Sequence, residues 1–237
     1  NFIPYPDRTE LRAGSTTRVT GFAEPVQGLW TWDGPSSSKL FATCDDGIFN
    51  ATTPGAVGSA DIAITEGITQ GVNIATGAGS YLLIVNGTDT LKQYDGSSWT
   101  STASFGSLTS SDISAIEVYK QRLFFIEKNS MNLWYLAINS ISGSATSFPL
   151  GAIFRRGGKL ASIAPWTVES GTGPDDLLVV ASTNGEVAVF AGSDPSSLAT
   201  WAYRGVYYLG RPLGGARSLY KHGGDLLYLC EHGLFPV

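Results

Sequence analysis

The sequence predicts an all-β fold built from repeated sheets, on three observations. The 237 residues include 29 glycines and 11 prolines, and 43% are hydrophobic while only 15% are charged. This composition suits many short strands joined by tight turns. No pattern for a helix of three turns is visible. One hairpin pattern recurs five times at a period of roughly 40–50 residues, which is typical of β-propeller blades.

Each repeat contains a leucine, a short apolar run, a polar turn and a second apolar run, which together indicate a hairpin. The aligned leucines are 41 to 54 residues apart: Leu40, Leu82, Leu123, Leu177 and Leu226. The first strand of the hairpin is apolar along its length, as expected when both of its faces are covered. A further strand precedes each hairpin, at 29–32, 72–75, 116–119, 161–164 and 217–220. A weaker outer strand follows some copies, as at 98–102 and 201–208.

Four strands per period predict a β-propeller of five to six blades. Residues 1–24 are expected to form an N-terminal strand segment that completes the ring or leads into it. The blades are expected at about 25–67, 68–110, 111–157, 158–210 and 211–237. A loop insertion at 169–175 and an extended outer strand near 199–209 account for the two long spacings. A β-sandwich is the alternative, but it does not predict the same hairpin at this period.

The ends of the chain indicate a fragment. Asn1 is not an initiator methionine, and the chain stops at Val237, just after an apolar strand pattern. We therefore expect a piece of a longer protein, in which the propeller ring can be incomplete.

Charge and hydropathy exclude two kinds of partner. The net charge of −5 and the pI of about 5.0 leave no basic footprint for gripping nucleic acid. The apolar runs are strand-sized, and none approaches the roughly 18 residues that a membrane-spanning helix needs. We therefore expect neither specific nucleic-acid binding nor a direct membrane segment.

The residues that could bind a metal are few. The repeat alignment places Cys44 and Cys230 at equivalent positions of different repeats, so we expect free, half-buried thiols that stay apart. The two histidines, His222 and His232, lie in turns beside glycines, and no partner stands at metal-ligand spacing. The sequence predicts no metal site.

Paired charges also lack the arrangement of a catalytic site. Asp45–Asp46 and Asp175–Asp176 are adjacent, and neighbouring residues on a strand or turn point in different directions. A glycosidase instead needs two carboxyl groups that face each other across a bond. Asp45–Asp46 followed by Gly is also an ordinary turn. The pair Arg155–Arg156 precedes two glycines and fits a solvated loop rather than a carboxylate-binding arginine cluster.

Other short motifs are interpreted as turns. The segment 95–99 (DGSSW) resembles the Asp-box of propeller blades, but its spacing departs from that motif, so we expect a turn with a packed Trp99. The glycine-containing segments 77–79 and 142–144 lack the lysine and following helix of a phosphate-binding loop. We therefore expect no enzyme, and no catalytic or cofactor-binding residues.

The chain resembles the propeller region of tail nozzle (tail tubular B type) proteins from short-tailed bacteriophages. The likeness begins with NFIPYP at 1–6 and ELRAG at 10–14, and it covers nearly the whole chain. Its most specific segments are RLFFIEKNS at 122–130 with WYL at 134–136, and GSDP at 192–195 continuing through Trp201 to GVY at 205–207. Such proteins are much longer, with further domains after the propeller.

The resemblance implies a structural virion protein, assembled in the bacterial cytoplasm and located in the tail. Such a subunit self-associates in a ring, as a hexamer, contacts adaptor (head-to-tail connector) proteins and tail fibres, and lets DNA pass without specific binding. An acidic conduit suits that passage, because each phosphate neutralised by Lys or Arg would add affinity.

Two other function classes remain open. A carbohydrate-binding or glycan-hydrolysing propeller is suggested by four tryptophans expected to be exposed: Trp30, Trp32, Trp99 and Trp201. A bare interaction scaffold is the third, since propellers host many unrelated functions.

Overall fold

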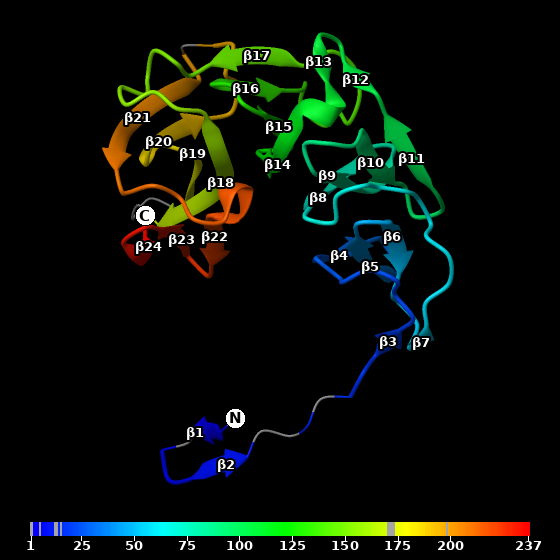
Figure 1. Cartoon of the computed structure of the whole chain (residues 1–237). Coiled ribbons are helices and arrows are strands. Elements are labelled where there is room, and N and C mark those ends of the chain that lie inside the picture. Colours follow the sequence, from blue (N-terminus) through cyan, green and yellow to red (C-terminus); the bar gives the residue numbers. More distant parts are fainter. Residues whose placement is uncertain (1, 5, 12–13, 15, 170–173, 198) are drawn as a thin grey trace.

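Five β-sheets form a ring in the computed structural model of the chain (Figure 1). The structure describes residues 2–4, 6–11, 14, 16–169, 174–197 and 199–237. Within these ranges the helices are two three-residue 3₁₀ turns, η1 (Ser110–Asp112) and η2 (Gly215–Arg217). The predicted all-β propeller is confirmed, with five blades.

Each blade is an antiparallel sheet whose strands run outward from the centre in chain order. Blade 1 contains β4 (Gly28–Asp33), β5 (Ser38–Cys44) and β6 (Gly47–Asn50). Blade 2 contains β8 (Gln70–Thr76), β9 (Gly79–Val85), β10 (Leu91–Tyr94) and β11 (Trp99–Thr102). Blade 3 contains β14 (Ile113–Tyr119), β15 (Arg122–Glu127), β16 (Asn132–Tyr135) and β17 (Thr146–Pro149). Blade 4 contains β18 (Leu160–Glu169), β19 (Pro174–Ser182), β20 (Glu186–Gly192) and β21 (Trp201–Tyr208). Blade 5 contains β22 (Leu219–His222), β23 (Asp225–Cys230) and β24 (Gly233–Pro236).

Three small strand pairs accompany the blades. A hairpin of β1 (Phe2–Pro4) and β2 (Thr9–Leu11) stands off the ring at the N-terminal end (Figure 1). The other two are the parallel pair of β3 (Val19–Thr20) with β7 (Gly55–Ala56) and the antiparallel pair of β12 (Ser104–Phe105) with β13 (Leu108–Thr109).

Turn chemistry sets where the hairpins close. Asn129, between β15 and β16, has φ 61°, and Gly185, between β19 and β20, has φ 88°. Asn and Gly tolerate this left-handed region better than other residues. A Cβ on Gly185 would also lie 2.6 Å from the carbonyl carbon of Gly210. These turns therefore need the residue types that the sequence supplies.

The core lies between neighbouring blades. Successive residues of a strand face opposite sides of its sheet, so Leu82 and Ile84 pack toward blade 1 while Leu83 and Val85 pack toward blade 3. Four apolar clusters fill the four interfaces in this way. This arrangement explains why the first strand of each hairpin in blades 2 to 4 is apolar along its length.

Blade 5 departs from that pattern. Its Leu226, Tyr228 and Cys230 pack on blade 4, but the intervening Leu229 is 39% exposed. Every residue of β24 is exposed. The ring is open between blades 5 and 1, so one face of blade 5 has no neighbouring sheet (Figure 1).

Details of the expected strands differ in two places. Arg217 ends the 3₁₀ turn η2 rather than beginning a strand, and β22 starts only at Leu219. The insertion expected at 169–175 falls at the tip of the β18–β19 hairpin, and its residues 170–173 lie outside the described residues. The extended outer strand is confirmed as the eight-residue β21.

Candidate functional site

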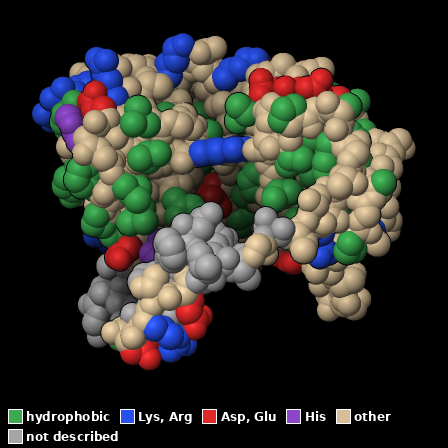
Figure 2. Space-filling view, turned by 60° about the horizontal axis from the view of Figure 1, so that its bottom comes forward, with side chains coloured by type: hydrophobic (Ala, Val, Ile, Leu, Met, Phe, Trp, Pro, Cys, Tyr) green, Lys and Arg blue, Asp and Glu red, His purple; other side chains and the backbone are tan. Residues whose placement is uncertain are grey.

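A groove of about 580 Å³ lies at the ring opening, between the inner strands of blades 1 and 5. Figure 2 shows the hollow between two parts of the molecule, crossed by a basic side chain. The groove is lined mainly by apolar and amide-bearing residues: Val26, Gln27, Gly28, Leu29, Trp30, Gln70, Gly71, Arg217, Leu219 and Tyr220.

Arg217 links the two sides of this opening. Its guanidinium donates hydrogen bonds to the backbone carbonyls of Gln27, at 3.3 Å, and Thr69, at 2.9 Å. Both acceptors belong to segments that lead into the inner strands of blades 1 and 2, far from Arg217 in sequence. Because the donor is charged, these two hydrogen bonds to backbone carbonyls link blade 5 to blades 1 and 2.

The floor of the groove is held by side-chain hydrogen bonds. The Gln27 amide donates to Asp45 at 2.9 Å, and the other oxygen of Asp45 accepts from the Gly67 N–H at 2.8 Å. The Trp30 indole N–H donates to the Thr69 hydroxyl at 2.7 Å. Gln27 Oε1 is buried and accepts no hydrogen bond from the described residues. The groove thus offers one unused acceptor beside an apolar wall.

A half-buried carboxyl lies on β14, an inner strand of the ring. Burial raises the pKa of Glu117 to about 7, although the Val118 N–H and the Lys221 ammonium lower it in part. The Val118 N–H lies 2.9 Å from the Glu117 carboxylate. Lys221 also donates to Thr167 at 3.1 Å. Inner strands of blades 3, 4 and 5 thus place a titratable acid near a lysine.

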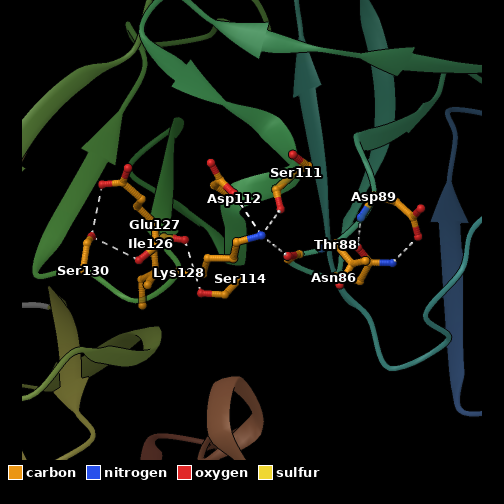
Figure 3. A network of polar contacts seen from close by, with 11 residues as sticks. Asn86, Thr88, Asp89, Ser111, Asp112, Ser114, Ile126, Glu127, Lys128 and Ser130 are labelled. Atoms are coloured by element: carbon orange, nitrogen blue, oxygen red, sulfur yellow. Dashed lines mark hydrogen bonds and ion pairs between the residues drawn. The ribbon is translucent and has the colours of Figure 1, made fainter.

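A separate polar network joins blades 2 and 3 (Figure 3). Lys128, after β15, donates to the carbonyls of Gly87 and Ser111 at 2.9 and 3.3 Å and pairs with Asp112 at 2.9 Å. Asn86 donates to Asp89 at 2.8 Å in the turn after β9. These contacts satisfy loop carbonyls and turn residues, so the network fixes three loops in place.

The two cysteines form no disulfide, as expected from the sequence. Cys44 on β5 and Cys230 on β23 are both free, but they are fully buried rather than half-buried. His222 ends β22 and His232 lies in the β23–β24 turn, and both are exposed. Across the described ranges, no three His, Cys, Asp or Glu side chains come together in a metal-binding arrangement.

The paired carboxylates lie where the turn and strand patterns predicted. Asp45 and Asp46 form the β5–β6 turn. Asp175 and Asp176 are consecutive on β19; Asp176 accepts from the Thr167 hydroxyl at 3.0 Å, and the side chain of Asp175 lies outside the described ones. The Asp45 carboxylate accepts hydrogen bonds from Gln27 and from the Gly67 N–H, so it holds neighbouring segments together.

The loop at Arg155 and Arg156 is held more firmly than expected. The buried Glu186 carboxylate accepts hydrogen bonds from both backbone N–H groups, at 3.2 and 2.7 Å. The guanidinium of Arg156 also stacks over the Tyr208 ring, 3.9 Å from its centroid. Residues 155–159 are exposed and belong to no strand, so the loop is solvated as expected, and Glu186 anchors its backbone.

The segment 95–99 is a turn with a packed tryptophan, as predicted. The Asp95 carboxylate accepts from the N–H groups of Ser97 and Ser98, both at 2.7 Å, and these bonds lower its pKa. The Trp99 ring packs against Phe41 and Tyr94, with centroids 5.0 and 5.2 Å apart.

The tryptophans expected to be exposed are not. Trp32 and Trp201 are 6% and 7% exposed, and Trp30 and Trp99 are half-buried. The Trp201 ring stacks with Phe190 and Phe124 between blades 3 and 4. The expectation failed because strand-borne aromatics fill the interfaces between blades.

Among the described residues, no helix is long and apolar enough to cross a membrane. No protein-family model matches the chain, and no curated protein matches it. In fold it is similar to BBS1N in a crystal structure of BBS1N in complex with ARL6DN, soaked with lead. That match has a TM-score of 0.56 and 14% identity, and it covers 92% of this chain and 66% of the BBS1N chain.

The same complex soaked with mercury matches with a TM-score of 0.52 and 13% identity, over 90% of this chain and 64% of the other. The chain thus spans slightly less than two thirds of the length of these matched chains. At such identities the likeness shows the propeller fold alone.

Sequence reasoning missed the residues that line the opening. Arg217 and Gln27 lie 190 residues apart and carry no motif. Glu117 looks like an ordinary polar position within an apolar strand. Only a closed or nearly closed ring brings such positions together, and no local signal could have identified them.

Proposed function

We propose that the chain is the propeller region of a structural virion protein, a tail nozzle subunit of a short-tailed bacteriophage. The observation that carries this proposal is the bare apolar face of blade 5 beside the ring opening. Tyr220 is 66% exposed, Leu234 59% and Leu229 39%. Contiguous apolar surface on a soluble domain marks a contact with another protein.

The charge balance is consistent with a conduit. With a net charge of −5, the chain has little electrostatic attraction for the DNA phosphates, so DNA would pass without binding tightly. The resemblance of segments 1–14 and 122–136 to nozzle proteins supplies the place in the virion. Copies of the chain would self-associate in a hexameric ring, below the adaptor proteins and beside the tail fibres.

Electron microscopy of intact particles tests the proposal. Antibodies raised against the purified chain are expected to label the tail axis, at a ring below the portal end. Particles that carry the protein but lack a ring at the tail axis would contradict the proposal.

A protein-binding scaffold of a different kind is the second candidate. The matched BBS1N structure is of a complex with ARL6DN, and the same exposed face of blade 5 would suit a protein partner. A carbohydrate-binding function has less support, because the four tryptophans that suggested it are buried or half-buried. Mass photometry of the purified chain separates the first two candidates, because rings favour the nozzle and monomers favour a scaffold. A glycan array tests carbohydrate binding.

A further inference from the structure

One end of the ring carries a continuous surface of loops, which we call the loop face. It contains the turn between the second and third strands of each blade and the connections that lead from one blade to the next. Hydrogen bonds join neighbouring loops around the ring, and they pair Gly67 with Asp45, Lys128 with Gly87, Lys159 with Asn129, Asn184 with Arg156 and Arg211 with Glu231. Segments that are far apart in the sequence therefore form one surface.

Acidic side chains gather on the part of the loop face that belongs to blades 1 and 2. Asp45 and Asp46 form the β5–β6 turn, and both are exposed. Glu66 lies in the connection between blades 1 and 2, and Asp89 lies in the turn between β9 and β10. The Asn86 amide donates both to Asp89, at 2.8 Å, and to the Glu66 carbonyl, at 2.9 Å, so the loops that carry these two acids adjoin. The four acids make up the acidic half of the loop face.

Basic side chains gather on the part of the loop face that belongs to blades 4 and 5. They lie in the connection between blades 3 and 4 and in the connection between blades 4 and 5. This basic half consists of four exposed residues, Arg155, Arg156, Lys159 and Arg211. The buried Glu186 and the exposed Glu231 lie beside them and accept hydrogen bonds from their backbone N–H groups. These two acids offset part of the positive charge, and the basic half keeps a net positive charge.

The charges of the two halves are not neutralised within the chain. The Lys159 ammonium donates to the Asn129 side chain at 2.6 Å, and the Arg156 guanidinium stacks on the Tyr208 ring, so both cations have uncharged partners. In the part of the chain that the structure describes, no side chain of either half forms an ion pair. Each half can therefore attract a surface of opposite charge.

Blade 3 separates the two halves with a neutral region, because its Lys128 is paired with Asp112 at 2.9 Å (Figure 3). In Figure 2, Lys and Arg side chains gather toward the left of the upper rim, and Asp and Glu side chains gather on its right. A two-fold axis in the plane of such a face places the acidic half of each copy over the basic half of the other. The loop face is therefore complementary to a second copy of itself, and charge complementarity of this kind selects the partner and its orientation.

Each half also carries an exposed apolar side chain. Ile68, close to Glu66 in the sequence, is 57% exposed, and Leu213, close to Arg211, is 49% exposed. Exposed ion pairs add little affinity by themselves, so a stable contact also needs apolar area. Two-fold pairing places Ile68 on the half that carries the partner's Leu213, which supplies apolar contact on both sides of the axis.

We propose that two copies of the chain pair through their loop faces, with the acidic half of each copy on the basic half of the other. This contact goes beyond the proposed function and does not depend on a place in the virion. It uses loops that hydrogen bonds already hold in place, so pairing requires no rearrangement of the blades.

Sedimentation velocity of the unmodified chain at two salt concentrations gives the first test. A rise from about 0.1 M to about 1 M salt shortens the screening length from about 10 Å to about 3 Å, so we expect the Kd of the dimer to rise at least about tenfold. A Kd that does not change with salt, or a chain that is monomeric at low salt, would overturn the proposal.

Exchange of charge between the halves gives the second test. The variant Asp46→Lys/Glu66→Lys makes the acidic half basic, and the variant Arg155→Glu/Lys159→Glu makes the basic half acidic. Each variant alone is expected to be monomeric at low salt, because like charges then face each other. An equimolar mixture is expected to form dimers with one copy of each, because every half again meets its opposite. If both variants fold and the mixture stays monomeric, the proposal is wrong; if a variant does not fold, the salt dependence of the unmodified chain decides.

A matched control changes the net charge equally at the opposite end of the ring. Asp33 and Asp225 are exposed and lie at turns between first and second strands, away from the loop face. Because distant charges are screened, Asp33→Lys/Asp225→Lys is expected to change the Kd of the dimer by less than about twofold. Equal losses in this variant and in Asp46→Lys/Glu66→Lys would show that net charge governs the association, which would refute the pairing. Rings without two-fold dimers would refute it as well and would support the nozzle proposal.

Discussion

Replacing Glu117 by Gln is expected to stabilise the fold above neutral pH. Burial raises the pKa of this carboxyl from 4.5 to about 7. A carboxyl with a raised folded-state pKa binds more protons in the folded than in the unfolded state between those two values. The free energy of unfolding therefore falls as the pH rises from about 4.5 to 7, and the penalty is complete above pH 7.

The magnitude follows from the pKa difference. At 1.36 kcal/mol per pKa unit, ionised Glu117 costs at most about 3 kcal/mol at pH 8. Glutamine keeps the size and the acceptor for the Val118 N–H but carries no charge. For a chain of this length each kcal/mol corresponds to about 2–4 °C, so E117Q is expected to raise the Tm at pH 8 by roughly 5–10 °C.

Differential scanning calorimetry at pH 5, 6, 7 and 8 measures this effect. At pH 5 the unmodified chain and E117Q are expected to differ by less than about 1 kcal/mol, because the buried carboxyl is still protonated. The difference should grow steadily to pH 8. The control is Glu24→Gln, which removes one exposed carboxylate and is expected to leave the pH profile unchanged. A constant difference between E117Q and the unmodified chain across the range, or a lower Tm for E117Q at pH 8, would refute the reasoning.

Three further substitutions test the packing and the polar links. Arg217→Ala removes both hydrogen bonds across the ring opening, so we expect faster hydrogen exchange of the backbone amides near Gln27. The free energy of unfolding is expected to fall by only about 1 kcal/mol, because the Arg217 side chain is exposed. Unchanged exchange near Gln27 would contradict the link. Lys128→Met leaves the carbonyls and Asp112 of Figure 3 without their donor and is expected to cost about 1 kcal/mol in urea unfolding, whereas a neutral result would mean that water replaces the ammonium. Trp201→Ala empties a buried stack between blades 3 and 4 and is expected to cost about 3–5 kcal/mol, with a loss below 1 kcal/mol arguing against that packing.

Local patterns in the sequence were enough to predict the strands and turns of the blades. The run Leu82–Val85 and its equivalents predict strands covered on both faces, and the structure buries all four residues between blades 1 and 3. The segment 95–99 predicts a turn, because an Asp side chain satisfies nearby backbone N–H groups without help from distant residues. Such features depend on neighbours within a few residues, so the sequence displays them directly.

The exposure of single side chains, and the proximity of residues that are distant in the sequence, could not be predicted from local patterns. Trp32 and Trp201 were expected at the surface, yet neighbouring blades bury them. Glu186 gives no sign in the sequence that it anchors the loop at Arg155 and Arg156, because its partners lie about 30 residues away.

The sequence by itself determined the all-β class, the repeat and the turns, since the side-chain period of two and the backbone preferences of Gly, Asn and Asp are properties of short segments. Only the tertiary structure decided that Arg217 links blade 5 to blades 1 and 2, and that Trp201 is buried between blades 3 and 4. Both features depend on contacts between residues that are far apart in the sequence. The packing of successive blades decides which of these residues come into contact, and no short segment of the sequence encodes that packing.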